Sequence, residues 1–238
     1  MKDIDELIQN TEKYAHALVQ KRFESKKHTV SYVLLDNQPR ILKWYAPGFR
    51  TNMETEYQIL QKGSSKLTIP SLLEKDTEHN VLIMGYIFGN NLGDIIDDEQ
   101  IPYAEKQTIL HTLSTWFAQF HNFFKDETSF RIRGDPSVRN FLFKEKIWGV
   151  DFEESRKGNP SEDVAGFCAS ILTLDPMFTA EKIRLCKAFI ESYIQSVEWK
   201  LETLNDDIAY ALMEKIPWRP DQEKILRQYA QHIGKKGL

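Results

Sequence analysis

Glycine is scarce at the start of this chain, where none occurs between Lys2 and Pro47. Because glycine lets a backbone approach phosphate groups closely, this absence excludes a glycine-rich phosphate loop in that region. The chain also lacks any apolar run near the roughly 18 residues of a membrane-spanning helix. Its first ten residues carry acids where a secretory signal would be apolar. We therefore expect a cytoplasmic protein without a membrane span.

The chain has few cysteines and only a small net charge. The only two cysteines, Cys168 and Cys186, lack metal-ligand spacing and lie in apolar helical patterns, which favours buried thiols in a reducing compartment. A net charge of −4 argues against a nucleic-acid partner. The 238 residues, 41% of them apolar, are enough for one sizeable core or two small ones.

The first third of the chain is predicted to be mostly β. Residues 29–45 read as two strands joined by a turn at Asp36-Asn37-Gln38-Pro39, and residues 69–87 read as another pair. A helix fits residues 52–63. Apolar residues at helical spacing predict an amphipathic helix over residues 3–20, although residues 17–23 also fit a strand.

The remainder is predicted to be mostly helical. A long helix over residues 103–125 carries an apolar stripe of Ile109, Leu110, Leu113, Trp116, Phe117, Phe120 and Phe124. Two short apolar runs follow, at 140–143 and 147–152. Another long helix is predicted to carry Phe189, Ile190, Tyr193, Ile194, Val197, Leu201 and Leu204 on one face, and a last helix surrounds residues 225–229.

Two acids and an amide stand beside the two short apolar runs. Asp135 precedes the first run, Asn140 begins it, and Asp151 follows "IWGV" in the second. Taken singly, Asp135 and Asn140 are as readily explained as turn residues. Together with Asp151, they offer the oxygen ligands that Mg²⁺ prefers and a carboxylate that could accept a proton from a hydroxyl group.

Three motifs in this region resemble a known family. "GDPSVRNFLF", "GVDFEES" and "EDVAGF" are similar to the catalytic, metal-binding and helical segments of the protein-kinase-like superfamily, in its aminoglycoside phosphotransferase and choline kinase branch. Upstream, "RILKWY", "TEYQIL", "NVLIMGYIFGNNLGDII" and "WFAQFHNFF" resemble further segments of that branch in the same order. The joint order is more specific than any single motif.

The resemblance implies a fold and a division of the chain. The fold would be α+β and bilobal. A small β-rich lobe would span residues 1–84, a hinge residues 85–93, and a larger helical lobe residues 94–238. Gly85 stands where the family often has an acid in the hinge, which hinge contacts through the backbone should tolerate.

In the helical lobe, the resemblance implies four roles. Asp135 would be the catalytic carboxylate that accepts or orients the proton of the substrate hydroxyl. Asn140 and Asp151 would hold Mg²⁺, and Asp163 would support the catalytic loop. Glu153 is either a group near the site or an exposed side chain.

In the β-rich lobe, the resemblance implies the nucleotide contacts. Lys43 would bind the phosphates of ATP, and Glu56 would orient Lys43 through an ion pair. Glu54 is the rival of Glu56 and lies on a different helix face. Met84 and Tyr86 would mark the backbone that pairs with adenine. "FESKKHT" at 23–29 stands where the phosphate loop is expected, with phosphate-binding side chains at Lys26, Lys27 and Thr29.

Other positions depart from the family pattern or carry no expected role. Arg133 replaces the usual histidine, and Ser137 replaces the lysine of protein kinases. Asp163 follows Asp151 by only twelve positions, which leaves no room for a protein-kinase activation segment. His111 and His121, ten positions apart on one predicted helix, are interpreted as packing or surface residues.

The implied function is a kinase that uses ATP and Mg²⁺ to phosphorylate a hydroxyl of a small molecule. Sugars, aminoglycosides and amino alcohols are the candidate acceptors. The nearest acids for a polycationic acceptor are Glu153, Glu154 and the pair Asp206-Asp207, of which the pair is more simply solvated surface. Two alternatives stay open. One is a compact atypical protein kinase or ATPase of the RIO or KEOPS type, with a protein partner, and the other is a pseudokinase that only binds.

Overall fold

The computed structural model of the chain describes residues 4–25 and 27–238, so the predicted phosphate contact of Lys26 lies outside the described residues. The chain divides into two compact units. Unit 1 runs to Phe88 and also includes Asp151–Glu154, and unit 2 comprises Gly89–Val150 and Ser155–Leu238. The lobe limits expected from the sequence, with a hinge at residues 85–93, stay a prediction.

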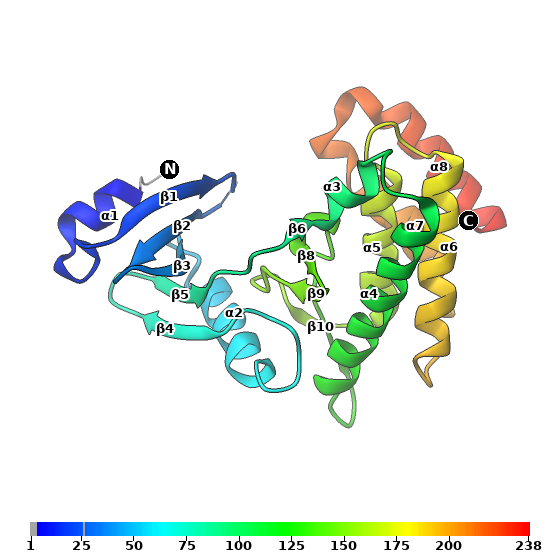
Figure 1. Ribbon diagram of the computed structural model, residues 1–238. Coiled ribbons are helices and arrows are strands. Elements are labelled where there is room, and N and C mark those ends of the chain that lie inside the picture. The colour runs from blue at the N-terminus through cyan, green and yellow to red at the C-terminus, as the bar shows by residue number, and fades with distance from the viewer. Residues whose placement is uncertain (1–3, 26) are drawn as a thin grey trace. The chain divides into compact units, whose positions relative to one another are not determined.

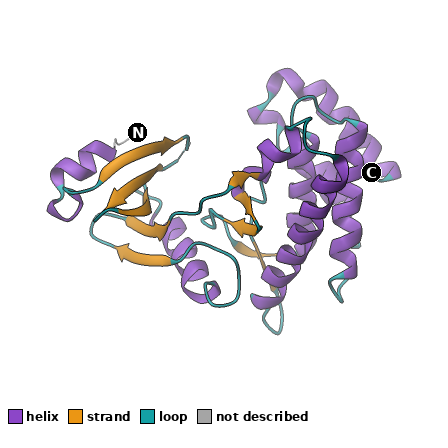
Figure 2. Ribbon diagram, in the orientation of Figure 1, coloured by secondary structure: helices purple, strands orange, loops and turns teal. Residues whose placement is uncertain are grey.

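Within the described residues, unit 1 contains a five-stranded antiparallel sheet in the order β1-β2-β3-β5-β4 (Figures 1 and 2). A long helix, α2, lies between β3 and β4 in the chain. The elements are α1 (Ile4–Asn10), η1 (Glu12–Tyr14), β1 (Leu18–Phe23), β2 (Thr29–Leu35), β3 (Gln38–Trp44), α2 (Arg50–Gly63), β4 (Leu72–Asp76) and β5 (Val81–Gly85).

The hairpin between β2 and β3 shows how the sequence specifies the sheet. Asp36 and Asn37 form a two-residue loop with φ of 53° and 58°. Two positive φ angles match the twist of a tight hairpin, and Asp and Asn tolerate them better than other non-glycine residues. Gln38 and Pro39, expected in the turn, already belong to β3, where Pro39 lies opposite Leu34.

The helix predicted over residues 3–20 is wrong in its length. It ends at Asn10, and Leu18 begins β1, where it pairs with Leu34 of β2. Leu18 is 58% exposed, so it does not continue the apolar face of the helix. Strand pairing has overridden a helical spacing that was plausible in isolation.

One hydrophobic cluster of unit 1 joins the sheet to the N-terminal segment. Its buried members are Ile4, Leu7, Tyr14, Ala17, Val33, Leu42, Trp44, Val81 and Ile83. At its edge, Tyr14 Oη donates a 2.6 Å hydrogen bond to Asp76, which also accepts from the ring of His79 at 2.9 Å and its backbone N–H at 3.0 Å. Burial opposes ionisation of Asp76, but these bonds and Lys13 hold its pKa well below its ordinary value.

The Asp76 network predicts a pH-dependent stability. Asp76→Asn should lower the free energy of unfolding by roughly 2–3 kcal/mol at neutral pH, since it removes charge-assisted hydrogen bonds. Because the folded-state pKa is depressed, the contribution is full above the ordinary value of 3.8 and is lost as the pH falls below it. Urea unfolding of both proteins at several pH values measures this. A difference that stayed constant down to pH about 2 would contradict the linkage.

Unit 2 is mostly helical in its described residues, with two small sheets in the orders β6-β8-β9 and β10-β7. Helices α4, α5 and α6 lie side by side in Figure 1. The elements are β6 (Asn90–Asn91), α3 (Leu92–Asp97), α4 (Tyr103–Phe123), β7 (Phe130–Ile132), η2 (Val138–Asn140), β8 (Phe141–Lys144), β9 (Lys146–Gly149), β10 (Arg156–Gly158), α5 (Pro160–Leu172), α6 (Ala180–Gln195), α7 (Leu204–Met213), η3 (Ile216–Trp218), η4 (Pro220–Gln222) and α8 (Glu223–Lys236).

The aromatic stripe predicted on α4 forms the core of unit 2. Trp116, Phe117 and Phe120 are buried, and the Trp116 and Phe120 rings stack with centroids 5.5 Å apart. Phe117 also packs against Phe167 of α5 and Phe189 of α6. These contacts fix the three helices on which the loops of the unit rest.

The long helix predicted to reach Leu204 is two helices. Helix α6 ends at Gln195, and Ser196 caps it, so Val197 and Leu201 lie in a connection. Leu204 then begins α7. Apolar residues on both sides of the connection preserve helical spacing, and periodicity alone cannot detect such a break.

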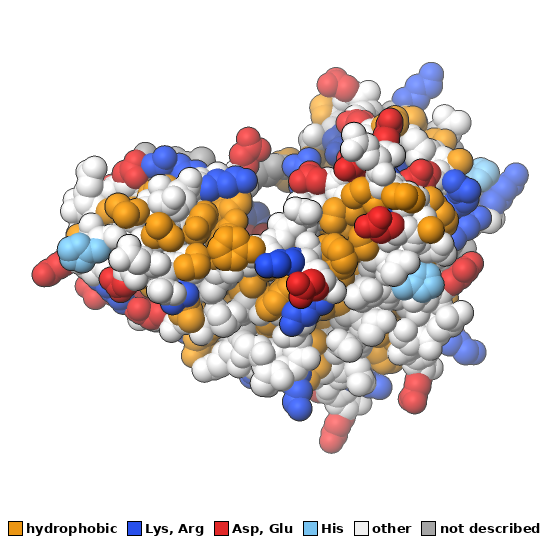
Figure 3. Space-filling view, viewed as in Figure 1, with side chains coloured by type: hydrophobic (Ala, Val, Ile, Leu, Met, Phe, Trp, Pro, Cys, Tyr) orange, Lys and Arg blue, Asp and Glu red, His pale blue; other side chains and the backbone are white. Residues whose placement is uncertain are grey.

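No helix among the described residues is both long and apolar enough to cross a membrane. Figure 3 shows acidic and basic side chains interspersed on the face drawn, without a broad field of one sign. Such a surface fits the small net charge of the sequence.

Candidate active site

The ammonium group of Lys43 lies at the centre of a charged cluster in unit 1. Its Nζ is 2.7 Å from Glu56 Oε2, 2.5 Å from Asp151 Oδ1 and 2.7 Å from Glu153 Oε2. Lys43 is only 4% exposed. Burial alone would lower the pKa of Lys43, but the surrounding carboxylates hold it well above its ordinary value. The lysine is therefore charged and held in one position.

Glu56 and Glu54, the two candidate partners of Lys43, have different environments. Glu56 is buried in α2, where its second oxygen, Oε1, accepts the Phe152 backbone N–H at 3.1 Å and Oε2 accepts the hydroxyl of Tyr45. Glu54 instead pairs with Lys75. The structure thus joins Lys43 to Glu56, while the orienting role of Glu56 stays a prediction.

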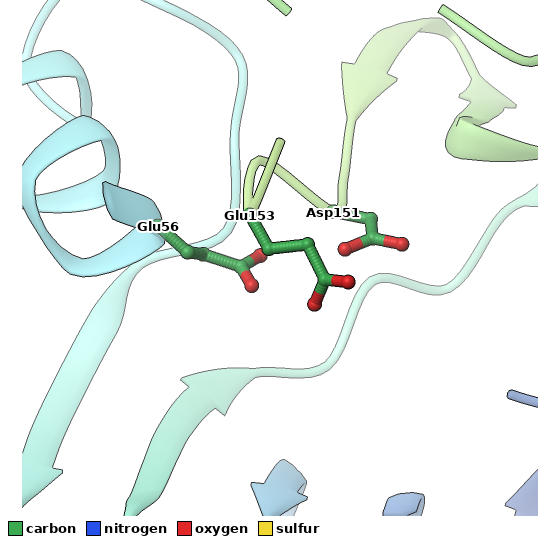
Figure 4. Close-up of side chains that lie close together, drawn as sticks. All are labelled: Glu56, Asp151 and Glu153. Atoms are coloured by element: carbon green, nitrogen blue, oxygen red, sulfur yellow. The ribbon is translucent and has the colours of Figure 1, made fainter. Parts of the chain in front are cut away.

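Three carboxylates converge in this cluster (Figure 4). Glu56 comes from α2, whereas Asp151 and Glu153 come from the segment after β9, and one oxygen of each lies within 4.8 Å of the others. Asp151 adopts a φ of 63°, a left-handed conformation that costs an aspartate less than a branched residue. Its side chain is 41% exposed, unlike those of the other two acids.

Glu153 is tied to the cluster by a residue that sequence reasoning missed. His28, 2% exposed, accepts the Ala46 backbone N–H on Nδ1 at 3.3 Å, so its Nε2 carries the hydrogen. That nitrogen lies 3.0 Å from Glu153 Oε2. Burial opposes ionisation of Glu153, but His28 and Lys43 lower its pKa to about 2. The interpretation of Glu153 as an exposed side chain is therefore wrong, because the residue is buried in the cluster.

Lys27, in the segment predicted to cover the phosphates, is engaged by an acidic side chain. Lys27 forms an ion pair with Glu154, which also lies 3.4 Å from Asn52 Nδ2. Glu154 is therefore already engaged within unit 1. Thr29 begins β2.

The predicted adenine-binding backbone lies at the end of β5. Met84 is buried and pairs with β3 and β4, and Tyr86 follows the strand with its ring stacked 4.1 Å from that of Tyr32. Between them, the Gly85 N–H donates to the Ser71 carbonyl at 2.9 Å. A Cβ on Gly85 would lie 2.6 Å from Ser71 Oγ, so a side chain there would require that hydroxyl to turn away. Adenine pairing would thus rely on the backbone of Met84 and Tyr86.

Asp135 and Asn140 lie together in unit 2, just before β8. The Asn140 amide Nδ2 donates to Asp135 at two places, the backbone carbonyl at 3.1 Å and Oδ2 at 3.2 Å. Since the amide nitrogen faces Asp135, the amide oxygen is directed elsewhere and can serve as a ligand. Asp135 is exposed, as a group that meets a substrate must be.

The loop that carries Asp135 is supported by the buried carboxylate of Asp163 in α5. Its Oδ2 accepts the Arg133 backbone N–H at 2.7 Å, and its Oδ1 accepts the Gly134 N–H at 3.1 Å. Nε2 of His121 donates to the same carboxylate at 3.0 Å, and Tyr193 Oη lies 2.8 Å from the other ring nitrogen. His121 is thus buried and part of this support, a role that its place in an apolar stripe did not reveal.

Arg133 replaces the family's usual histidine without leaving a gap. Its guanidinium is fully buried, lies over the rings of Trp116 and Phe141 and donates to the Val150 carbonyl at 2.6 Å. It requires glycine at position 149, because a Cβ there would lie 2.9 Å from Arg133 Nη1 and 2.4 Å from the Trp116 ring.

Each of the two residues predicted to hold magnesium has a suitable donor atom. Asp151 and Asn140 offer one carboxylate and one amide oxygen, which are hard ligands, and neither a thiol nor an imidazole belongs to this pair. Asp151 belongs to unit 1 and Asn140 to unit 2.

No protein-family model matches the chain, and no curated protein matches its sequence. Solved structures do match. A gentamicin complex of APH(2")-IIa has 12% identity and a TM-score of 0.64, and covers 99% of this chain and 97% of its own. Thermostable aminoglycoside phosphotransferase APH(4)-Ia, in a ternary complex with ADP and hygromycin B, has 14% identity, a TM-score of 0.65 and 98% coverage of both chains.

A macrolide phosphotransferase matches as well. MphH, the macrolide 2'-phosphotransferase of Brachybacterium faecium, shares 10% identity and a TM-score of 0.61, with 97% of both chains covered. Identities this low establish the fold and leave the substrate open. Together with the sheet of unit 1 and the helices of unit 2, these matches confirm that the chain has the α+β, protein-kinase-like fold of the aminoglycoside and macrolide phosphotransferases.

Proposed function

We propose that the chain is an ATP- and Mg²⁺-dependent phosphotransferase that moves the γ-phosphate to a hydroxyl of a small molecule. The observation that carries this proposal is Lys43, held by Glu56 at 2.7 Å and Asp151 at 2.5 Å. A buried, charged and fixed lysine beside a half-exposed carboxylate is suited to the phosphates of a nucleotide and their metal ion.

Each residue of the proposed site has a defined task. Lys43 binds the phosphates, and Glu56 prevents the ammonium from turning away. The Met84 and Tyr86 backbone holds adenine. Asp135 accepts the proton of the acceptor hydroxyl while the hydroxyl oxygen attacks the γ-phosphorus of ATP. The bond between the γ-phosphorus and the oxygen that bridges it to the β-phosphate breaks in the same step, which leaves ADP.

Magnesium would be held by Asn140 and Asp151, where it would neutralise charge on the phosphates. Asp163 and His121 take no part in the transfer, but they keep the loop of Asp135 in place. Since Asp163 accepts two backbone N–H groups of that loop, its contribution is positional.

The test is ADP formation from Mg·ATP, measured with and without a panel of sugars, amino alcohols and aminoglycosides. Acceptor-dependent ADP release, with ³²P recovered on the acceptor, is the expected result. Label recovered on the protein alone would favour an atypical protein kinase. Failure of millimolar Mg·ATP to raise the melting temperature would instead indicate a pseudokinase, because a ligand that binds the native state must stabilise it.

A further inference from the structure

We propose that the acceptor carries an anionic group, which Lys215 binds beside the hydroxyl that Asp135 activates. This inference rests on the proposed function and names the class of its substrate. All the residues that carry it belong to unit 2. It separates the chain from enzymes whose acceptors are polycations.

One face of α5 contacts both the loop that follows Asp135 and the segment that carries Lys215 and Arg219. A Cβ on Gly166 would lie 2.7 Å from Pro136, the residue after Asp135, and Ser170 Oγ accepts the Val138 N–H at 3.0 Å. Thr173, which caps the end of the same helix, accepts Arg219 Nη1 on its carbonyl at 2.7 Å. Positions 166, 170 and 173 are four and three residues apart and therefore share a face.

Arg219 is held at the end of α5, because its Nη1 contacts both the Thr173 carbonyl and, at 3.0 Å, Gln222 Oε1. Lys215 stands one turn earlier in the chain, and its backbone carbonyl accepts the Trp218 N–H at 3.1 Å. The segment from Lys215 to Arg219 thus brings two cations to the face of α5 that also carries the Asp135 loop.

Lys215 is partly buried, and its ammonium group makes no hydrogen bond to any residue that the structure describes. Burial lowers its pKa, and the charge of Arg219 lowers it further, while Asp135 and Glu214 act in the opposite direction. The charges of Asp135 and Glu214 therefore favour the ammonium form of Lys215. A partly desolvated cation without a hydrogen-bond acceptor is unfavourable until an anion binds it.

Asp207, one of the acids considered for a polycationic acceptor, is already engaged. Asp207 accepts from Ser161 Oγ at 2.5 Å and from Thr203 Oγ1 at 2.8 Å. The Asp207 carboxylate is therefore less available to a polycation, whereas the Lys215 ammonium has no hydrogen bond to any residue that the structure describes.

The experiment has a binding arm and a transfer arm. In the first, the melting temperature is measured with gluconate, glucose 6-phosphate, glucose or kanamycin, for the wild type, Lys215→Gln and Lys224→Gln. Lys224 is an exposed lysine of α8 and serves as the matched control. In the second arm, the same four compounds are offered as acceptors with Mg·ATP.

We expect gluconate or glucose 6-phosphate to stabilise the wild type and Lys224→Gln but not Lys215→Gln. In transfer, Lys215→Gln should raise the KM for the anionic acceptor roughly 10- to 100-fold, since one charge-assisted hydrogen bond is lost, and Lys215→Arg should recover part of it. The absence of any Lys215-dependent stabilisation by the two anionic compounds would overturn the proposal. So would equal transfer to glucose or kanamycin, or a rise in the KM for ATP instead.

The two proposals fail in different ways. Lys215-dependent stabilisation without phosphate transfer to any compound would refute the phosphotransferase function and leave the anion site standing. Transfer to kanamycin or glucose, without binding of the anionic compounds, would refute the anion site and leave the function standing.

Discussion

Asp135→Asn is expected to lower kcat by roughly 10²- to 10⁴-fold, the range attributed to a positioned general base. Asparagine keeps the shape of the side chain but cannot accept the hydroxyl proton. The loop should keep its position, because Asp163 holds the backbone N–H groups of Arg133 and Gly134 rather than Asp135 itself. The affinity for Mg·ATP, measured by thermal shift, should therefore change little.

The control for this substitution is Asp36→Asn. Asp36 is exposed in the β2–β3 turn, where asparagine tolerates the positive φ equally well. It should leave kcat and the melting temperature unchanged. Near-normal turnover of Asp135→Asn in the presence of a confirmed acceptor would show that another group accepts the proton.

Lys43→Met should affect stability as well as nucleotide binding. It removes the cation shared by Glu56 and Glu153, whose side chains are 2% and 9% exposed. Losing one partner of a buried ion pair costs on the order of 3–5 kcal/mol, because the remaining charges are left uncompensated in a region of low dielectric. Affinity for ATP should fall in the same variant, which loses its phosphate-binding cation.

Two comparisons make this prediction specific. Lys62→Met, at an exposed position of α2, should change the free energy of unfolding by less than about 0.5 kcal/mol. Adding Glu153→Gln to Lys43→Met should recover part of the loss, because one uncompensated carboxylate is removed. If Lys43→Met and Lys62→Met unfolded at the same denaturant concentration, the cluster would not have the energetic role assigned here.

The effect of Lys43→Met should also depend on pH. The pKa of Glu153 is lowered to about 2 from its ordinary 4.5, so its interaction with Lys43 is fully present above pH 4.5 and is lost as the pH falls toward 2. The difference in unfolding free energy between wild type and variant should therefore shrink over that interval.

The order of motifs along the chain was enough to predict the fold and to select residues that the structure brings together. Lys43, Glu56 and Asp151 are separated by 12 or more positions in the chain, yet they meet in one cluster. Lys43 lies in β3 and Glu56 in α2, and Asp151 follows β9, so each stands in or just after an element that the sequence pattern predicts. Their functional roles stay predictions.

What the sequence could not reveal were contacts between residues far apart in the chain, even where both residues lie in recognisable segments. His28 and Glu153 are 125 positions apart, and nothing in either neighbourhood signals the other. His121 lies among the apolar residues of α4, where a buried histidine bonded to Asp163 and a packing histidine leave the same pattern. Short elements such as β6 and β10 depend on pairing with distant strands and have too few residues for a period.

The way Asp163 holds the Asp135 loop has a consequence for how such sequences diverge. The carboxylate contacts main-chain N–H groups, which every residue except proline possesses, so the side chain at position 133 is not part of that recognition. Arginine can therefore stand there, provided that its aromatic neighbours and glycine at 149 make room. A sequence that lacks the family's histidine can preserve the geometry of its loop, and the histidine's absence is poor grounds for judging such a chain inactive.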